Sequence, residues 1–188
     1  MAETSSLVRR ILDGDKESFR IIVNENQRLV SHIVFRMVYN KTDREDLCQE
    51  VFLKVYKNLS QFHFGAKISS WIARITYNTC LDFLKKKKHP ASDTVSFEDV
   101  ENQDLTGDYT SPDESVKREE MSTFLHREIE MMPPNYQTIL TLYHLEDLSY
   151  TEISKIMQIP EGTVKSHLFR ARKLLKERLT SKYQKENL

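Results

Sequence analysis

Apolar residues recur at intervals of three and four along most of this 188-residue chain, which is the spacing of amphipathic α-helices. No stretch alternates apolar and polar residues for long enough to indicate a β-strand. Glycine and proline, which interrupt helices, number only 4 and 5. The sequence therefore predicts an all-α fold. Because a hydrophobic content of 39% fills only modest cores, we expect two small helical domains rather than one large domain.

Charged side chains are segregated along the chain, although the formal net charge is zero. Four lysines at 85–88 precede a stretch rich in Gly, Pro, Ser, Thr, Asp and Asn, in which every charged residue from Ala91 to Ser115 is acidic. This composition is typical of a linker. We expect a first domain over residues 1–88, an acidic flexible linker over 89–113 and a second domain over 114–188.

Two successive amphipathic helices are predicted in the first domain. Asp15 is placed to act as the N-cap of the first helix, whose apolar residues recur at helical spacing from Phe19 to Met37. Thr42 and Glu45 have the spacing of a capping box, so the second helix is expected to begin at Thr42.

The second helix has one apolar face and one mixed face. An outward leucine among polar residues is compatible with a solvated helix and with a partner-binding surface, and the pattern alone leaves both interpretations open. The inward stripe consists of Leu47, Val51, Val55 and Leu59, and the outward face of Asp46, Gln49, Glu50, Leu53, Lys54 and Lys57.

An aromatic-rich loop and a helix that ends in four lysines follow, in the stretch FHFGAKISSWIARITYNTCLDFLKKKK. Aromatic rings stack on bases and cations neutralise phosphates, so Phe64, Trp71 and Tyr77 are candidates for holding single-stranded nucleic acid. Residues at helical spacing such as Trp71, Ile72, Ile75 and Leu81 are more often part of a hydrophobic core, and lysines at a helix C-terminus suit the helix dipole. Composition alone does not decide between these interpretations.

The second domain carries a helix-turn-helix pattern. Two prolines at 133–134 suit the first turn of a helix. Ser149 and Glu152 form a second capping-box pair at the start of the next helix. Pro160 ends that helix, and Gly162 starts the last one. Two helices joined by a tight turn, with the second rich in cations, are typical of a DNA-binding element.

The last helix has an apolar stripe and an opposite polar face that suits a DNA major groove. Arginine bridges the O6 and N7 atoms of guanine, serine bonds base edges, and Lys165, Arg172 and Lys173 are placed to neutralise phosphates. The apolar stripe consists of Val164, Leu168, Ala171 and Leu175, and the opposite face of Thr163, Ser166, His167, Arg170 and Lys173.

Taken together, the chain resembles a bacterial RNA polymerase sigma factor of the extracytoplasmic-function group, in the sigma-70 family. The resemblance rests on DREDLCQEVFLKVYKNL, SSWIARITYNTCLDFLKKKK and LSYTEISKIMQIPEGTVKSHLFRARKLL, in that order and at that separation. It covers nearly the whole chain apart from the linker and the tail after about Lys182. It implies a non-catalytic factor, without a cofactor or metal, that directs core polymerase to promoters, recognises their minus-35 and minus-10 elements and promotes DNA melting.

The resemblance also implies roles for single residues. Contacts with the clamp helices of the polymerase β′ subunit are expected at Asp46, Gln49, Glu50 and Leu53. Contacts with the separated minus-10 strand, including a pocket for one flipped base, are expected at Phe64, Gly65, Ala66, Lys67 and Asn78. At the minus-35 element, bases are expected to be read by Lys165, Ser166, Phe169 and Arg170, and phosphates to be contacted by Thr163 and Arg172.

The chain departs from the common family pattern at two places. Ile68 and Ser69 stand ahead of Ser70 and Trp71, which leaves the identity of the flipped base open. His167 stands where many relatives carry arginine, which is expected to soften a phosphate contact.

Cysteine usage and the absence of export signals favour a cytoplasmic protein. Cys48 and Cys80 lie in apolar helical patterns without CxxC spacing, so we expect reduced, buried thiols. No signal-peptide pattern opens the sequence, and no apolar run approaches the ~20 residues that span a bilayer. The resemblance implies three partners: core RNA polymerase, promoter DNA and an anti-sigma protein.

Two other functional classes remain as alternatives. One is a stand-alone helix-turn-helix regulator that binds duplex DNA as a dimer, although the N-terminal half shows neither alternating strands nor an acidic phosphorylation pocket. The other is a protein that mimics a sigma factor without initiating transcription. An enzyme is disfavoured because the sequence contains no HExxH, no GxSxG and no Gly-rich phosphate loop.

Overall fold

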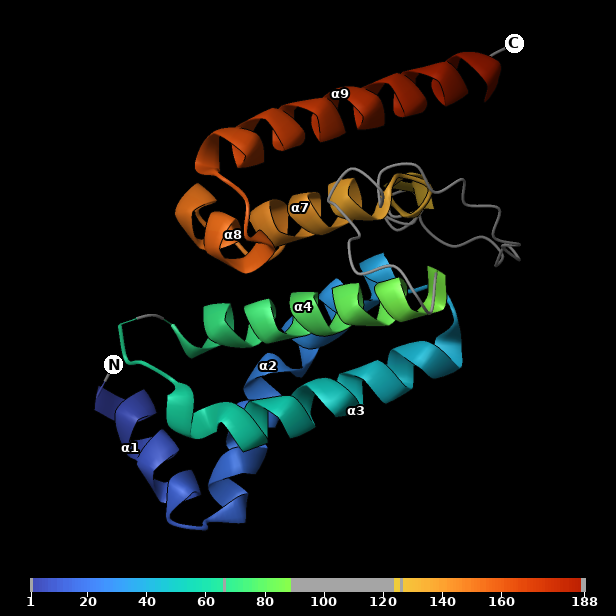
Figure 1. Ribbon diagram of the computed structural model, residues 1–188. Helices are drawn as coiled ribbons and strands as arrows, with labels where there is room; N and C mark the ends of the chain where they lie inside the picture. The colour runs from blue at the N-terminus through green and yellow to red at the C-terminus, as the bar shows by residue number, and fades with distance from the viewer. Residues whose placement is uncertain (1, 66, 89–123, 126, 187–188) are drawn as a thin grey trace.

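The structure, a computed structural model, describes residues 2–65, 67–88, 124–125 and 127–186. Within these ranges every regular element is a helix, which confirms the all-α prediction (Figure 1). The predicted acidic linker over 89–113 lies outside the described residues. The elements are α1 (Ala2–Leu12), α2 (Lys16–Met37), α3 (Lys41–Asn58), the 3-10 turn η1 (Leu59–Gln61), α4 (Ile68–Lys88), α7 (Pro134–His144), α8 (Tyr150–Met157) and α9 (Glu161–Glu186).

Helices α1 to α4 form an N-terminal bundle in which α2, α3 and α4 pack on one another and α1 packs on α2. Asp15 caps α2 as predicted, because its Oδ1 accepts hydrogen bonds from the backbone N–H groups of Glu17 and Ser18 at 3.0 and 3.2 Å. The same carboxylate pairs with Arg10 at the end of α1 at 2.6 Å. The capping carboxylate therefore also links the end of α1 to the start of α2.

The start of α3 differs from the prediction of a Thr42–Glu45 capping box. The helix begins at Lys41, and its N-cap is Asn40, whose side-chain oxygen accepts a hydrogen bond from the backbone N–H of Asp43 at 3.1 Å. Asn40 adopts the extended backbone that an N-cap needs, and asparagine is a strong N-cap residue. Thr42 already lies within the first turn, so its hydroxyl cannot cap the helix.

Helices α7, α8 and α9 form the predicted helix-turn-helix arrangement. Pro133 and Pro134 open α7, and the Ser149–Glu152 capping box is confirmed in both directions, with distances of 3.2 and 3.0 Å. The turn between α8 and α9 passes through Gln158, which has a left-handed backbone with φ of 57° and ends α8.

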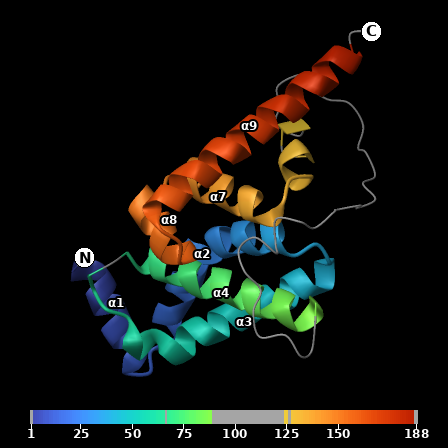
Figure 2. The ribbon, with the colours of Figure 1, turned by 45° about the horizontal axis from the view of Figure 1, so that its top comes forward.

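The two bundles pack against each other, with α7 on α2 and α8 on α4 (Figure 1; Figure 2). Buried apolar residues of both bundles belong to one cluster, which includes Val34 and Ile72 of the first bundle and Met132 and Ile153 of the second. Helix α3 packs on the side of α4 away from α7 to α9 (Figure 1). The outward face of α3 therefore stays clear of the second bundle.

Both cysteines are free thiols, as expected. Cys80 is buried and Cys48 is half-buried, and burial raises the pKa of each thiol.

Candidate nucleic-acid interface

The outward face of α3 has the orientation that the sequence predicts. Leu47, Val51 and Val55 are buried on the inner side. The side chains that the sequence assigns to polymerase contact are all exposed, and the side chain of Leu53 is the most exposed large hydrophobic residue of this helix at 60%. These four residues are Asp46, Gln49, Glu50 and Leu53.

A groove between α2 and α3 adjoins this face and was not predicted from the sequence. Its volume is about 610 Å³, and it shares Gln49 and Leu53 with the predicted contact face. Phe19 and Tyr56 meet edge to face in its wall with ring centroids 4.9 Å apart. Tyr56 lies three residues after Leu53 on α3, so helical spacing was a usable signal for it. The other lining residues are Lys16, Val23 and Phe52.

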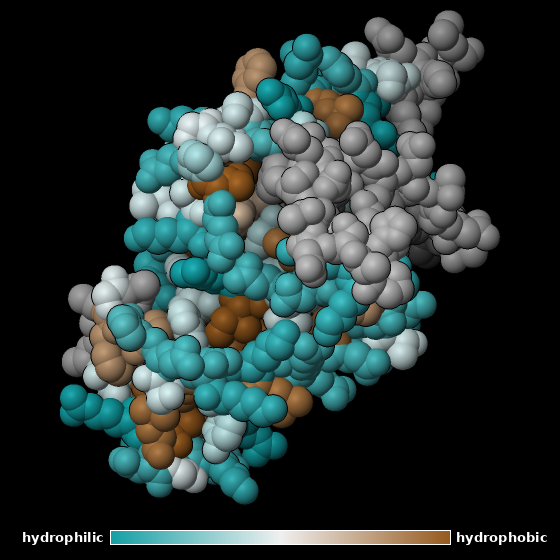
Figure 3. Space-filling view, in the orientation of Figure 1, coloured by the Kyte–Doolittle hydropathy of each residue, from teal (hydrophilic) through white to brown (hydrophobic). Residues whose placement is uncertain are grey.

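The surface over α3 and α4 is largely hydrophilic, with apolar residues gathered in small separate patches (Figure 3). The groove beside Leu53 is lined mainly by apolar side chains, and Lys16 and Gln49 are its polar members. This combination is common at the centre of protein interfaces.

The loop before α4 places only some of the predicted minus-10 residues at the surface. Phe64 is 43% exposed and packs edge to face on the buried Phe62 at 5.3 Å. Gly65 has open space around its α-carbon, and Lys67 is exposed. Asn78 is half-buried on α4, and Ala66 lies outside the described residues.

Two aromatic residues considered for base stacking belong mainly to the interior. Tyr77 is only 1% exposed, and burial raises the pKa of its hydroxyl, so its proposed stacking role is wrong. Trp71 is half-buried, and its ring contacts Phe62 with centroids 5.4 Å apart. Phe64 is thus the aromatic residue that the loop leaves available to a base.

The polar face of α9 is confirmed for most of its residues. Val164, Leu168 and Ala171 are buried, whereas Phe169 is 70% exposed. The Ser166 hydroxyl donates to the backbone carbonyls of Gly162 and Thr163 at 3.1 and 3.0 Å. Lys165 and Arg170 are also exposed, and Thr163 is half-buried.

His167 does not lie on the polar face, so this part of the prediction is wrong. Its side chain is only 7% exposed, and its ring centroid lies 5.8 Å from that of Tyr136 on α7. The position follows Val164 by three residues and precedes Ala171 by four, so it shares their inward stripe. A histidine there fills the seam between α7 and α9.

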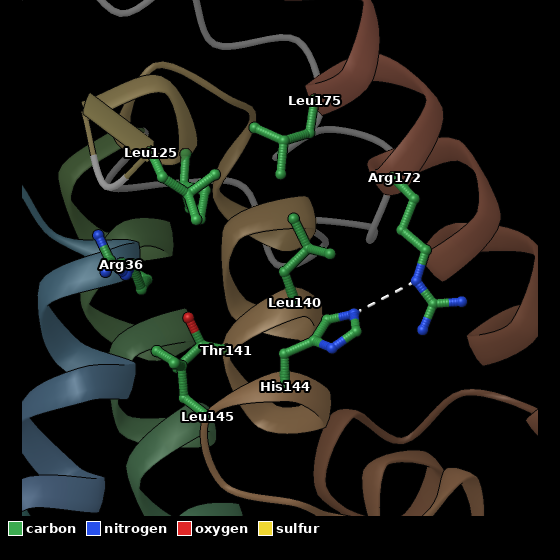
Figure 4. A pocket seen from close by; sticks show the side chains of 9 residues that line it. Arg36, Leu125, Leu140, Thr141, His144, Leu145, Arg172 and Leu175 are labelled. Atoms are coloured by element: carbon green, nitrogen blue, oxygen red, sulfur yellow. Dashed lines mark hydrogen bonds between the residues drawn. The ribbon is translucent and has the colours of Figure 1, made fainter. Parts of the chain in front are cut away.

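Arg172 is turned toward α7 rather than straight into solvent (Figure 4). Its Nε donates to His144 Nε2 at 3.3 Å, and its guanidinium carbon lies 5.0 Å from the centroid of Tyr143. Burial and the nearby Arg172 charge both lower the pKa of His144, which favours the neutral imidazole that accepts this bond. Tyr143 in turn stacks on Tyr150 at 5.2 Å.

These contacts border an apolar cavity of about 180 Å³ between the helices of the second bundle (Figure 4). Arg36 of α2 reaches its edge, so the cavity lies where the bundles meet. No group of three His, Cys, Asp or Glu side chains in the described part of the chain is arranged to hold a metal ion. None of the described helices is both long and apolar enough to cross a membrane.

Two protein-family descriptions match the chain, Sigma-70 region 2 over residues 22–89 and Sigma-70, region 4 over residues 125–175. The RNA polymerase sigma-H factor of Pseudomonas aeruginosa is 33% identical over 181 residues, which cover 94% of each protein. The ECF RNA polymerase sigma-E factor of Escherichia coli K12 is 34% identical over 173 residues and 90% of each protein. SigW, an ECF RNA polymerase sigma factor of Bacillus subtilis, is 30% identical over 176 residues, 92% of this chain and 94% of SigW.

Two solved structures share the fold. CnrH, in complex with the cytosolic domain of CnrY, superposes with a TM-score of 0.64 at 16% identity, over 93% of this chain and 96% of CnrH. The sigma factor RpoE of Bartonella quintana, in complex with the anti-sigma factor NepR, superposes with a TM-score of 0.67 at 18% identity, over 87% of this chain and 98% of RpoE.

Proposed function

The chain belongs to the extracytoplasmic-function group of sigma-70 factors, and we propose that three of its exposed surfaces carry out separate parts of the group's function. Members of this group are non-catalytic subunits that direct RNA polymerase to promoters for transcription initiation. The outward face of α3 binds core polymerase. The loop before α4 holds the minus-10 strand, and α9 reads the minus-35 element.

The proposal for α3 is supported by the exposure of Leu53 beside a polar rim. An exposed leucine next to an apolar groove supplies the apolar centre of an interface, and Asp46, Gln49 and Glu50 supply its polar edge. Lys54 Nζ pairs with Glu50 Oε1 at 2.8 Å, so the charge of Glu50 on this acidic edge is already neutralised. The β′ clamp helices are the proposed partner.

The proposal for the loop is supported by Phe64 and Lys67. An exposed ring stacks on a base without regard to its identity, and an exposed lysine neutralises the adjoining phosphate. Gly65 between them has no side chain to obstruct the strand. Asn78 is half-buried on α4 and is proposed as a hydrogen-bonding partner of the held strand.

The observation that carries the proposal is the one-sided character of α9. Its inner stripe is buried against α7 and α8, while Lys165, Ser166, Phe169 and Arg170 stand exposed. A 70%-exposed phenylalanine is costly in water but offers an apolar contact to a thymine methyl group. Arg170 is placed to form a bidentate bond to guanine, and Thr163 and Arg172 are proposed to contact phosphates.

The deciding experiment uses the full chain with core polymerase. A pool of random duplexes is first selected with the reconstituted holoenzyme to obtain a preferred promoter. Fluorescence anisotropy then compares binding of that duplex with and without core polymerase, and run-off transcription tests initiation. We expect weak binding by the free chain, because its net charge is zero, and specific binding and transcription by the holoenzyme.

The same experiment separates the alternatives. Tight, sequence-specific binding by the free chain as a dimer would contradict the proposal and support a stand-alone regulator. Polymerase binding without transcription would support a mimic of a sigma factor. We further propose that the chain acts in the bacterial cytosol, where polymerase works. We also propose that an anti-sigma protein restrains it, by analogy with the complex of RpoE and the anti-sigma factor NepR.

A further inference from the structure

Two stacked tyrosine rings lie between two cationic side chains of α9. The rings belong to Tyr143, near the end of α7, and Tyr150, the first residue of α8, and their centroids are 5.2 Å apart with planes inclined by 20°. The guanidinium carbon of Arg172 lies 5.0 Å from the centroid of Tyr143. Lys165 Nζ lies 5.8 Å from the centroid of Tyr150. Both distances allow cation–π attraction, and we call the four residues the aromatic ladder.

Hydrogen bonds also hold the Arg172 end of the ladder. Arg172 Nε donates to His144 Nε2 at 3.3 Å, so the guanidinium is held at one edge as well as on one face (Figure 4). A hydrogen bond with the side chain of Tyr143 raises the pKa of Tyr150, which also receives a hydrogen bond from Arg172. The remaining N–H groups of the guanidinium are available to a phosphate.

The ladder lies along the part of α9 that is proposed to enter the major groove. Lys165 and Arg172 are seven residues apart, which is about 10.5 Å along the helix and places them on one face. The major groove is about 12 Å wide, and a recognition helix contacts base edges with its N-terminal residues. Lys165 is therefore placed at the bases, and Arg172, two turns later, at the phosphates beside them.

The ladder restricts both cations without covering them. Unrestrained lysine and arginine side chains exchange among many rotamers in water, and the entropy that they lose when a ligand immobilises them opposes binding. Lys165 and Arg172 are exposed, whereas the two tyrosines are half-buried. Part of the ordering that DNA binding requires is thus already present in the free chain.

We propose that Tyr143 and Tyr150 are positioning residues for minus-35 recognition. Tyr143 orients Arg172 toward the phosphates, and Tyr150 orients Lys165 toward the bases. This inference rests on the proposed function, because it uses the assigned DNA contacts of Lys165 and Arg172. It extends the recognition surface from α9 to α7 and α8, whose rings act through the cations of α9.

The test is a double-mutant cycle in the full chain, reconstituted with core polymerase and bound to its selected promoter duplex. The first cycle combines Y143L with R172A, and the second combines Y150L with K165A. Y143F and Y150F are the matched controls, because phenylalanine retains the ring face. Fluorescence anisotropy measures the dissociation constant at a series of salt concentrations, and circular dichroism during heating verifies that each variant is folded at the assay temperature.

Y143L is expected to weaken promoter binding by about two- to fivefold, the equivalent of one exposed cation–π contact. In the R172A background the same substitution is expected to have no effect, because Tyr143 acts through Arg172. The plot of log K against log salt is expected to become flatter by up to about 0.9, the slope of one phosphate contact. A merely structural role would lower Tm without changing this slope, and Y143F is expected to retain both affinity and slope.

Y150L is expected to show the same dependence on Lys165. Because Lys165 is proposed to read bases, its loss of affinity is expected to be larger on the selected promoter than on one with an altered minus-35 element. In the K165A background this difference is expected to disappear, and Y150F is expected to retain it.

Three results would overturn the proposal: leucine variants that bind as tightly as the wild type, phenylalanine variants that lose as much affinity as the leucine variants, or equal losses with and without the partner cation. The last result would mean that the tyrosines contact DNA themselves or only support the fold. A failure of the proposed function would show separately, as a wild-type holoenzyme that selects no promoter, and this inference would fall with it.

Discussion

Arg170 and Arg172 lie two residues apart on α9, and the structure predicts different consequences for their loss. Arg172 bonds His144 and covers Tyr143, whereas Arg170 is exposed and has no hydrogen bond or ion pair with any other described residue. Arg172→Ala is therefore expected to loosen the joint between α7 and α9. Arg170→Ala is expected to leave the fold intact and to change only DNA recognition.

The magnitudes follow from these contacts. An exposed cation–π pair contributes about 0.5–1 kcal/mol, and the hydrogen bond to His144 contributes about 0.5–1.5 kcal/mol. Arg172→Ala is expected to lower the unfolding free energy by about 1–2 kcal/mol, which corresponds to a fall in Tm of roughly 2–8 °C for a chain of this size. Arg170→Ala is expected to leave Tm unchanged but to lose about 1–3 kcal/mol of discrimination between promoters.

Circular dichroism during heating measures the first effect, and run-off transcription by the holoenzyme measures the second. Transcription is compared on the preferred promoter and on the same promoter with an altered minus-35 element. Arg172→Lys is an informative companion, because lysine retains the charge but not the planar donor group. An unchanged Tm in Arg172→Ala, or an equal loss on both promoters in Arg170→Ala, would refute this division of roles.

Further predictions concern the polymerase face, the core of the second bundle and acid stability. Alanine at Asp46, Gln49 and Glu50 together is expected to weaken retention of core polymerase in a pull-down at unchanged Tm, because these side chains are exposed; undiminished retention would exclude this face. Leu168→Ala is expected to cost about 2–5 kcal/mol in denaturant unfolding, because Leu168 is only 1% exposed, and a cost below about 1 kcal/mol would contradict the packing. Hydrogen bonds from Ser18, and secondarily Arg10, lower the pKa of Asp15 from 3.8 to about 2, so its contribution to stability is present above pH 3.8 and is lost as the pH falls toward 2. Acid unfolding of Asp15→Asn, followed by circular dichroism, is expected to depend less on pH in this interval than that of the wild type, and identical slopes would argue against the cap.

Local sequence was sufficient for most features that depend on residues three or four positions apart, with the cap of α3 as the exception. The Asp15 cap, the Ser149–Glu152 capping box and the buried stripe of Val164, Leu168 and Ala171 all lie within one or two turns of a helix. Their side chains meet through helical geometry alone, whatever packs around them. The all-α fold and the exposed face of α3 followed from the same periodicity.

Local pattern failed where a neighbouring element decides the environment of a side chain. His167 was assigned to the outward face because it is polar, although its spacing from Val164 and Ala171 places it on the inward stripe, where it lies beside Tyr136 of α7. Composition left Tyr77 open between base stacking and the core, and packing of α4 within the bundle buries it. Asn40 replaced Thr42 as the cap of α3 because the connection from α2 places Asn40 in an extended conformation.

The contact between the bundles was decided by tertiary structure alone. His32 and Glu146 are 114 residues apart, and Ser70 and Glu152 are 82 apart. No periodicity connects residues across such separations, because their proximity depends on how complete helices pack and not on the turn of any one helix. The sequence by itself thus predicted the surfaces that we propose for contact with polymerase and promoter DNA. Tertiary packing decided that the loop before α4 meets α8 while the face of α3 stays open. The physical reason is that burial of apolar surface between α2, α4, α7 and α8 brings the carboxylates of one bundle onto the basic groups of the other.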